Sequence, residues 1–223
     1  MRLHFSFLIA LLLFSLGVNA QNLKNINTSD LIIECSKNGG ELPSKQIAIW
    51  YPSQIWQIIG EQMKFTPNVV DHLTNGTKDY LIFAVVDYTV GSTLPLFKFK
   101  SKSEISETMI LTDSSNKKHF PLKNEDMSYL TRKIVTDLEP MLAKMLGQFG
   151  EGMQIIVFKM PETYGKDGLD ISKKNNFSLH WNSTTLKWKL PFASVLPIKH
   201  CPIDQEEMKG NWDFCPEHGK SLN

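Results

Sequence analysis

Between residues 177 and 190 the sequence alternates large apolar side chains with polar ones in two short runs. A turn-forming segment, Asn-Ser-Thr-Thr at 182–185, separates the runs. The apolar positions are Phe177, Leu179, Trp181, Leu186, Trp188 and Leu190. Because successive side chains of a strand point to opposite faces, this spacing places all six on one side of a hairpin. Such a face has to be buried, so the chain must fold around a sheet.

Other apolar runs predict more strands and a few helices. Tyr80 to Val86 is continuously apolar between turn residues, which is typical of a central strand buried on both faces. Helical spacing predicts helices over 53–65, 66–73 and 127–148. Shorter strands are predicted over 31–33, 47–51, 94–100, 109–112, 119–122 and 153–158. Because strands and helices do not alternate regularly, the sequence predicts an α+β fold with a largely antiparallel sheet and two to three helices.

Local signals refine the helical predictions. Asn75-Gly76 predicts a turn after the second helix. Pro140 lies inside the long helix and is expected to kink or split it. The apolar face of this helix is predicted to comprise Leu130, Ile134, Leu138, Leu142, Met145 and Phe149.

Residues 1–20 have the layout of a cleavable secretory signal. Arg2 supplies a positive charge, an apolar run follows over 5–16, and Gly17 to Ala20 include the small residues of a cleavage site. The run is shorter than the roughly 20 residues that a membrane-spanning helix needs. We therefore expect a soluble mature protein that begins near Gln21, is periplasmic or extracellular, and has no transmembrane segment.

Composition divides the mature chain into three parts. Residues 21–45 form a polar segment, 46–198 contain most of the predicted elements of an α+β domain, and 199–223 form a C-terminal appendage of different texture. The chain has 24 basic and 23 acidic residues, and only Arg2 lies in the predicted signal, so the mature chain is formally neutral. This balance argues against nucleic-acid binding, which depends on neutralising phosphates.

The appendage contains a Cys-Pro-x-ligand pattern twice. Cys201 is followed three positions later by Asp204, and Cys215 is followed three positions later by His218. A two-residue gap lets one tight turn bring both side chains to the same ion. The sequence therefore predicts a zinc-ribbon-like knuckle in which Cys201, Asp204, Cys215 and His218 hold a structural Zn²⁺.

Several alternatives compete with that ligand set. His200 is a rival for the place of Asp204, and a Cys201–Cys215 disulfide is natural in an oxidising compartment. A tail without metal is a further interpretation. A catalytic zinc would keep one coordination position open for water.

Three segments carry a family resemblance. They are Asp87-Tyr-Thr-Val-Gly91, Met145-Leu-Gly-Gln-Phe-Gly150, and the closing Cys-Pro … Gly-Asn-Trp … Cys-Pro-x-His-Gly, which together lie within residues 79–219. The chain in this respect resembles a group of exported bacterial proteins of uncharacterised function. The resemblance implies a cell-envelope protein with a zinc-ribbon-like tail, and it implies no catalytic residue.

Other chemical signals have structural interpretations. The glycines at 147, 150 and 152 follow a predicted helix and precede a strand, which is the reverse of a dinucleotide-binding loop, so they predict a helix stop. Asp87 is expected to cap a turn, and Cys35 is expected to be a small buried residue or a disulfide partner. His72, His119 and His180 are predicted to lie on the surface.

The sequence favours a non-enzymatic binding or envelope-associated module with a structural zinc site. Its partner is then an unidentified protein or small-molecule ligand. The alternative function is a periplasmic zinc-dependent hydrolase, and a metal carrier or sensor is a third hypothesis. A general base beside the metal would favour the hydrolase, and Glu206, Glu207 and Glu217 are the available residues.

Overall fold

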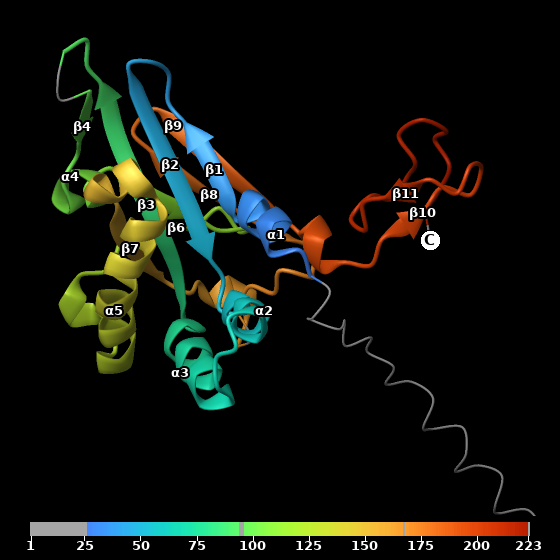
Figure 1. Ribbon diagram of the computed structural model, residues 1–223, viewed down its shortest axis with the longest axis horizontal. Coiled ribbons are helices and arrows are strands. Elements are labelled where there is room, and N and C mark those ends of the chain that lie inside the picture. The colour runs from blue at the N-terminus through green and yellow to red at the C-terminus, as the bar shows by residue number, and fades with distance from the viewer. Residues whose placement is uncertain (1–25, 94–95, 167, 223) are drawn as a thin grey trace, which may run out of the picture.

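A computed structural model describes residues 26–93, 96–166 and 168–222. It has the predicted α+β class, with antiparallel sheets and a C-terminal Cys/His cluster (Figure 1). The predicted signal at 1–20 and the predicted start of the mature chain lie outside the described residues. Within the described ranges, no helix is both long and apolar enough to cross a membrane.

The larger sheet is built around β3, which is the predicted central strand. Its strand order is β1-β2-β3-β4, and β7 also pairs with β3. Every residue from Tyr80 to Asp87 is buried, which confirms the prediction from the apolar run. The strands are β1 (Ser36–Gly39), β2 (Ser44–Tyr51), β3 (Tyr80–Val90), β4 (Phe97–Phe99) and β7 (Gln154–Lys159).

The second sheet contains the hairpin predicted from the alternating sequence. Its order is β6-β5-β8-β9, and Phe177 pairs with Trp188 across the hairpin. All six predicted apolar side chains are at most 4% exposed, which confirms the buried face. The strands are β5 (Met109–Thr112), β6 (Lys118–His119), β8 (Asn175–Trp181) and β9 (Thr184–Leu190).

Aromatic side chains join the two sheets. The rings of Phe177 and Trp188 are stacked, with centroids 5.0 Å apart and an interplanar angle of 10°. From the larger sheet, Phe83 approaches Trp188 at 5.5 Å and Trp50 approaches Phe177 at 4.9 Å. These contacts form the centre of the main hydrophobic core.

Helices cover the opposite face of the larger sheet. Tyr88 points away from the face that carries Phe83, and its ring lies 5.1 Å from that of Phe149, just after α5. The structure contains α1 (Thr28–Cys35), α2 (Ile55–Gln62), α3 (Pro67–Thr77), α4 (Lys102–Ser106) and α5 (Tyr129–Met145). The 3-10 segments are η2 (Asn124–Asp126), η3 (Gly147–Gly152), η4 (Glu162–Tyr164) and η5 (Ala193–Val195).

Two local predictions are wrong. Residues 31–33 are not a strand but part of α1, because the side chain of Asn27 caps this helix by accepting from the N–H of Ser29 at 3.0 Å. Asn75-Gly76 is not a turn but lies inside α3. A Cβ atom at Gly76 would overlap Ile134 of α5, so this glycine serves the close approach of two helices.

The long helix also differs from its prediction in detail. It continues through Pro140 without splitting. Met145 was assigned to its apolar face but is 74% exposed, because it is the last residue of the helix. In the first turn of the helix, Thr131 is buried and donates a 2.8 Å hydrogen bond to the carbonyl oxygen of Gly76.

Glycines end α5 as predicted. Gly147 has φ +57°, the left-handed conformation that commonly terminates a helix. Gly150 lies against α5, where a Cβ atom would overlap the carbonyl oxygen of Ala143. The chain then enters β7, which carries part of the core.

We expect Gly150→Ala to lower the free energy of unfolding by about 2 kcal/mol, because the added carbon meets backbone that cannot rotate away. Gly147→Asn is the matched control. Nothing lies within 4 Å of a Cβ atom there, so this variant loses only about 1 kcal/mol for its left-handed backbone. Urea unfolding measures both values, and a Gly150→Ala protein as stable as the wild type would contradict this packing.

Candidate metal centre

The C-terminal residues 199–222, here called the knuckle, consist of two turns of the same form. The short strands β10 (Lys199–His200) and β11 (Glu207–Met208) pair across the first turn. In that turn the N–H of Gln205 donates to the carbonyl oxygen of Cys201 at 2.9 Å. In the second turn the N–H of Gly219 donates to the carbonyl oxygen of Cys215, also at 2.9 Å.

The residue that closes each turn has a left-handed backbone. Gln205 has φ 63° and Gly219 has φ 61°. Each turn therefore directs its cysteine and the residue three positions later toward the same side. The repeated sequence pattern thus corresponds to a repeated backbone geometry.

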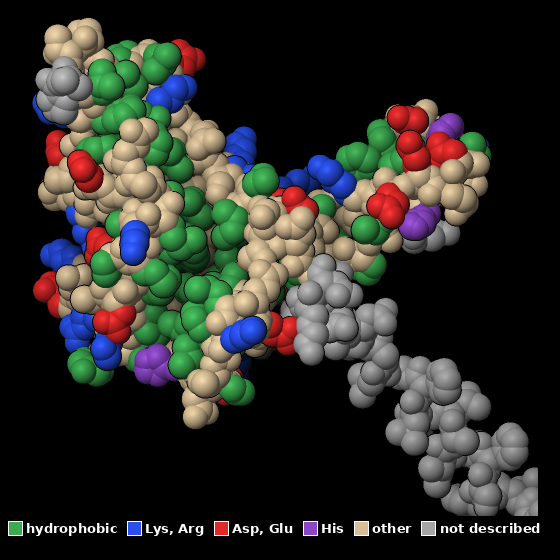
Figure 2. Space-filling view, viewed as in Figure 1, with side chains coloured by type: hydrophobic (Ala, Val, Ile, Leu, Met, Phe, Trp, Pro, Cys, Tyr) green, Lys and Arg blue, Asp and Glu red, His purple; other side chains and the backbone are tan. Residues whose placement is uncertain are grey.

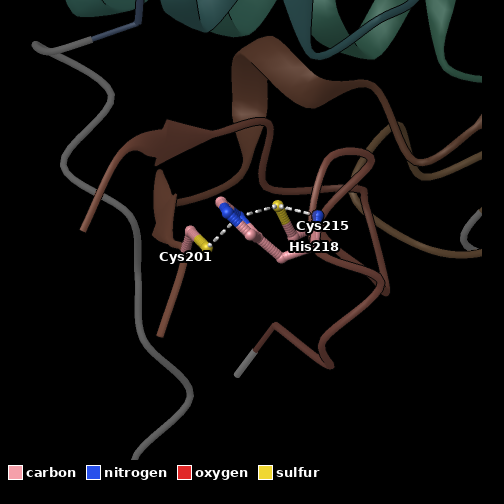
Figure 3. Close-up of side chains that lie close together, drawn as sticks. All are labelled: Cys201, Cys215 and His218. Carbon is pink, nitrogen blue, oxygen red and sulfur yellow. Dashed lines mark hydrogen bonds between the residues drawn. The ribbon is translucent and has the colours of Figure 1, made fainter. Parts of the chain in front are cut away.

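The two turns bring Cys201, Cys215 and His218 together. The His218 Nδ1 atom lies 3.4 Å from the Cys201 sulfur and 3.6 Å from the Cys215 sulfur. Figure 3 shows the imidazole lying between the two sulfur atoms. Both thiols are free, and both cysteines are at most 1% exposed. These three residues are close enough to hold a metal ion.

Asp204 lies at the edge of this cluster. Its Oδ2 atom is 3.6 Å from His218 Nδ1, and its side chain is 35% exposed. Ligand atoms of Asp204, Glu217 and His218 form a second group, all within 4.8 Å of one another. His200, the rival fourth ligand, belongs to neither group among the described residues.

The spacings match those around a tetrahedral ion. Zn–S and Zn–N bonds of about 2.3 and 2.0 Å at a tetrahedral angle give a sulfur–nitrogen separation of about 3.5 Å. The two measured sulfur–nitrogen distances lie on either side of this value. The arrangement therefore suits an ion placed between the three groups, with Asp204 beside the remaining position.

Burial and mutual contacts shift the pKa values of the residues in this cluster. Burial raises the pKa of the Cys201 thiol. For Cys215, burial acts in the same direction, but hydrogen bonds from the backbone and ring of His218 outweigh it and lower the pKa. The Cys215 thiol raises the pKa of the His218 imidazole, and the Cys201 thiol lowers the pKa of the Asp204 carboxyl. Without a metal, a Cys215 thiolate paired with a His218 imidazolium is thereby favoured, and a bound cation would take the place of the ring proton.

The knuckle has very little hydrophobic core of its own. Its buried cluster consists of Cys201, Met208, Cys215 and Leu222, so two of four members are candidate ligands. Figure 2 shows this segment standing out from the main body of the protein. Asn211 anchors it by donating to the carbonyl oxygen of Pro191 at 3.1 Å. Hydrophobic packing alone therefore contributes little to the order of this unit.

Other candidate residues serve the fold. Cys35 is buried and free, as expected for a small core residue, and burial strongly raises the pKa of its thiol. His119 was predicted as a surface residue, yet its Nε2 atom lies 2.9 Å from Oδ2 of the buried Asp113. Asp113 also accepts from the backbone N–H groups of Ser115 and Lys117, which fixes the loop between β5 and β6.

Sequence reasoning missed Gln46, and placed Asp87 in the wrong setting. Asp87 does not cap a turn but lies within β3, buried opposite Gln46 of β2. The available signal was alternation, because Gln46 has the same strand parity as the inward-facing Trp50.

Comparison with protein-family models, curated proteins and solved structures finds no match.

Cobalt substitution tests the cluster directly. We expect Co²⁺ to bind the metal-free protein with a thiolate-to-cobalt charge-transfer band, because two sulfurs face the ion. Cys215→Ser should weaken binding by about 100-fold or more, since loss of an outer-shell partner alone costs about 10–100-fold. Cys35→Ala is the matched control and should bind as the wild type does. An unchanged spectrum in Cys215→Ser would refute the assignment.

Affinity for the metal should fall as the pH is lowered. Metal binding requires neutral His218 and thiolate cysteines, and the raised pKa values of His218 and Cys201 let protons compete at higher pH than for ordinary groups. With at least one proton displaced, the affinity should drop roughly tenfold per pH unit from about pH 7 to about pH 5. Competition with a chromophoric chelator measures this slope, and a flat profile would contradict it.

Proposed function

We propose that this chain is an exported binding module whose knuckle is held together by one structural Zn²⁺. The observation that carries the proposal is the position of His218 Nδ1 between the Cys201 and Cys215 sulfurs. Asp204 is proposed as the fourth ligand, because its Oδ2 atom lies beside the same nitrogen. Export is supported by the predicted secretory signal at 1–20.

Zinc is favoured by the donor set. Two thiolates and an imidazole suit a soft or borderline cation, whereas Ca²⁺ and Mg²⁺ prefer oxygen ligands. A tetrahedral site with four protein ligands is the usual form of structural zinc. Because the knuckle has only four buried apolar residues, much of its stability would come from the ion.

A binding role is supported by the surface of the knuckle. Its exposed apolar side chains include Ile203 at 58% and Phe214 at 63%. A small projecting unit that exposes such side chains is suited to contact with a partner. The ion would then order this contact surface rather than perform chemistry.

One observation favours the hydrolase alternative. The Glu217 carboxylate is within 4.8 Å of the ligand atoms of Asp204 and His218, which is where a general base would stand. If Asp204 did not bind the ion, water could take its place. Chelator-sensitive hydrolysis that Glu217→Gln abolishes without loss of zinc would establish this function instead.

Elemental analysis tests the zinc proposal. We expect about one Zn²⁺ ion per purified chain, with X-ray absorption showing two sulfur and two nitrogen or oxygen neighbours. Chelation should accelerate amide hydrogen exchange within residues 199–222 while leaving β8 and β9 protected, because the main core does not include the knuckle. A Cys201–Cys215 disulfide with no metal would overturn the proposal.

A matched pair of variants examines Asp204. Asp204→Ala should lower zinc affinity, whereas Asp213→Ala, an exposed acidic residue of the same knuckle, should not. Equal affinities in the two variants would remove Asp204 from the ligand set.

A further inference from the structure

A polar cavity lies at one end of the space between the two sheets. Its volume is about 640 Å³, it opens to solvent, and it is lined by the β1–β2 turn, the start of β2, β3, the residue Lys100 after β4, and the β8–β9 turn. Both turns lie at the same end of the molecule in Figure 1. The volume falls within the range of roughly 300–1,000 Å³ that is typical of small-molecule sites. Its polar lining includes Glu41, Gln46, Asp87, Lys100, Asn182 and Thr184.

Gln46 and Asp87 interrupt an otherwise apolar inward face. They are paired across β2 and β3, and they continue the face on which Trp50 and Phe83 meet the second sheet. Gln46 is 6% exposed and Asp87 is 1% exposed. Burying an amide and a carboxylate at the end of a hydrophobic core is unfavourable unless their hydrogen bonds are satisfied. Asp87 also forms an ion pair with Lys100, and an ion pair that involves a buried carboxylate is weak evidence for a purely stabilising role.

The hydrogen bonds of this pair are incomplete. The Asp87 Oδ2 atom accepts from Lys100 Nζ at 3.1 Å, Gln46 Nε2 at 3.4 Å and Asn182 Nδ2 at 3.5 Å. The two amide contacts are longer than usual for N–H···O bonds. The Gln46 Oε1 atom is buried and has no partner. Gln46 Nε2 also lies 3.5 Å from the carbonyl oxygen of Trp181, so the N–H groups left for a ligand are those of Lys100 and Asn182 that do not point at Asp87.

The charge of the cavity selects among ligands. Its ammonium group, Lys100, is already paired with Asp87, so an anion would find no unpaired cation among the described lining residues. Glu41 is a second carboxylate of the lining, but it is exposed, and a cationic ligand at Asp87 would have to compete with Lys100 for the same carboxylate oxygen. Amide, carboxylate and ammonium groups side by side instead suit neighbouring hydroxyl groups, each of which both donates and accepts.

We propose that this cavity binds a neutral polyhydroxylated molecule of about the size of one sugar ring. The Asp87 carboxylate accepts from its hydroxyl groups, while Lys100 and Asn182 donate to them, and the buried Gln46 amide holds that carboxylate in place. The inference deepens the proposed function, because it names a ligand class for the binding module. The cavity proposal can nevertheless be wrong while the zinc proposal is right, because none of the cavity residues belongs to the knuckle.

NMR titration of the full mature protein with glucose, galactose, mannose and N-acetylglucosamine tests the proposal. At least one sugar should shift the amide signals of Gln46, Asp87 and Asn182 in a saturable way, with a Kd of about 1 mM or tighter. Asp87→Asn and Asn182→Gly should each weaken that binding at least about tenfold. Glycine suits position 182, because Asn182 is an exposed turn residue with φ 52°.

Asn116→Gly is the matched control. Asn116 is also a turn residue with φ 65°, but it lies at the β5–β6 end of the second sheet and is not part of the cavity lining. Its variant should bind sugar as the wild type does. Thermal unfolding and zinc content, recorded for every protein, should remain unchanged in both glycine variants.

Three results would overturn the inference. The first is no shift at these residues with any sugar up to about 10 mM. The second is equal sugar affinity in Asn182→Gly and Asn116→Gly. The third is saturable binding of the diamine putrescine, but of no sugar, at the same residues. Each leaves the zinc proposal standing if about one Zn²⁺ per chain is retained.

Discussion

Aromatic rings packed between the two sheets form the contact on which the rest of this fold depends. Phe177 and Trp188 belong to the hairpin, and Phe83 reaches them from the centre of the larger sheet. Trp188 also donates its Nε1–H to the carbonyl oxygen of Cys35 at 2.9 Å, which ties the α1–β1 junction to the same core. Burying several aromatic side chains at one place supplies the dominant favourable term, so both sheets and the N-terminal elements are held in one arrangement.

This core ends where the polar groups begin. At one end of the sheets, the inward face changes from Trp50 and Phe83 to the paired Gln46 and Asp87. At the C-terminal end of the chain, the knuckle has only a small buried cluster, and the hydrogen bond from Asn211 to Pro191 helps to attach it to the main body. The molecule therefore combines a body that is stabilised by hydrophobic packing with a tail whose small buried cluster contains two of the residues that could hold a metal ion.

Strands and candidate ligands were largely predictable because both are encoded over short distances. Alternation predicted the hairpin, an apolar run predicted β3, and the repeated Cys-Pro-x-ligand spacing predicted which side chains of the knuckle would meet. One error involves a helix cap close by in the sequence, and the other involves a contact between distant residues. Leu31–Ile33 looks strand-like alone but lies in a helix capped by Asn27, and Gly76 looks like a turn residue but serves the packing of α3 on α5.

The sequence by itself determined the α+β class, the buried face of the hairpin and the clustering of Cys201, Cys215 and His218, because side-chain periodicity and turn length act between near neighbours. Only the tertiary structure decided which face of the larger sheet meets the second sheet. It also decided that Asp87 lies buried beside Gln46 and Asn182. These outcomes depend on residues up to 95 positions apart, and no local pattern records how such segments come together.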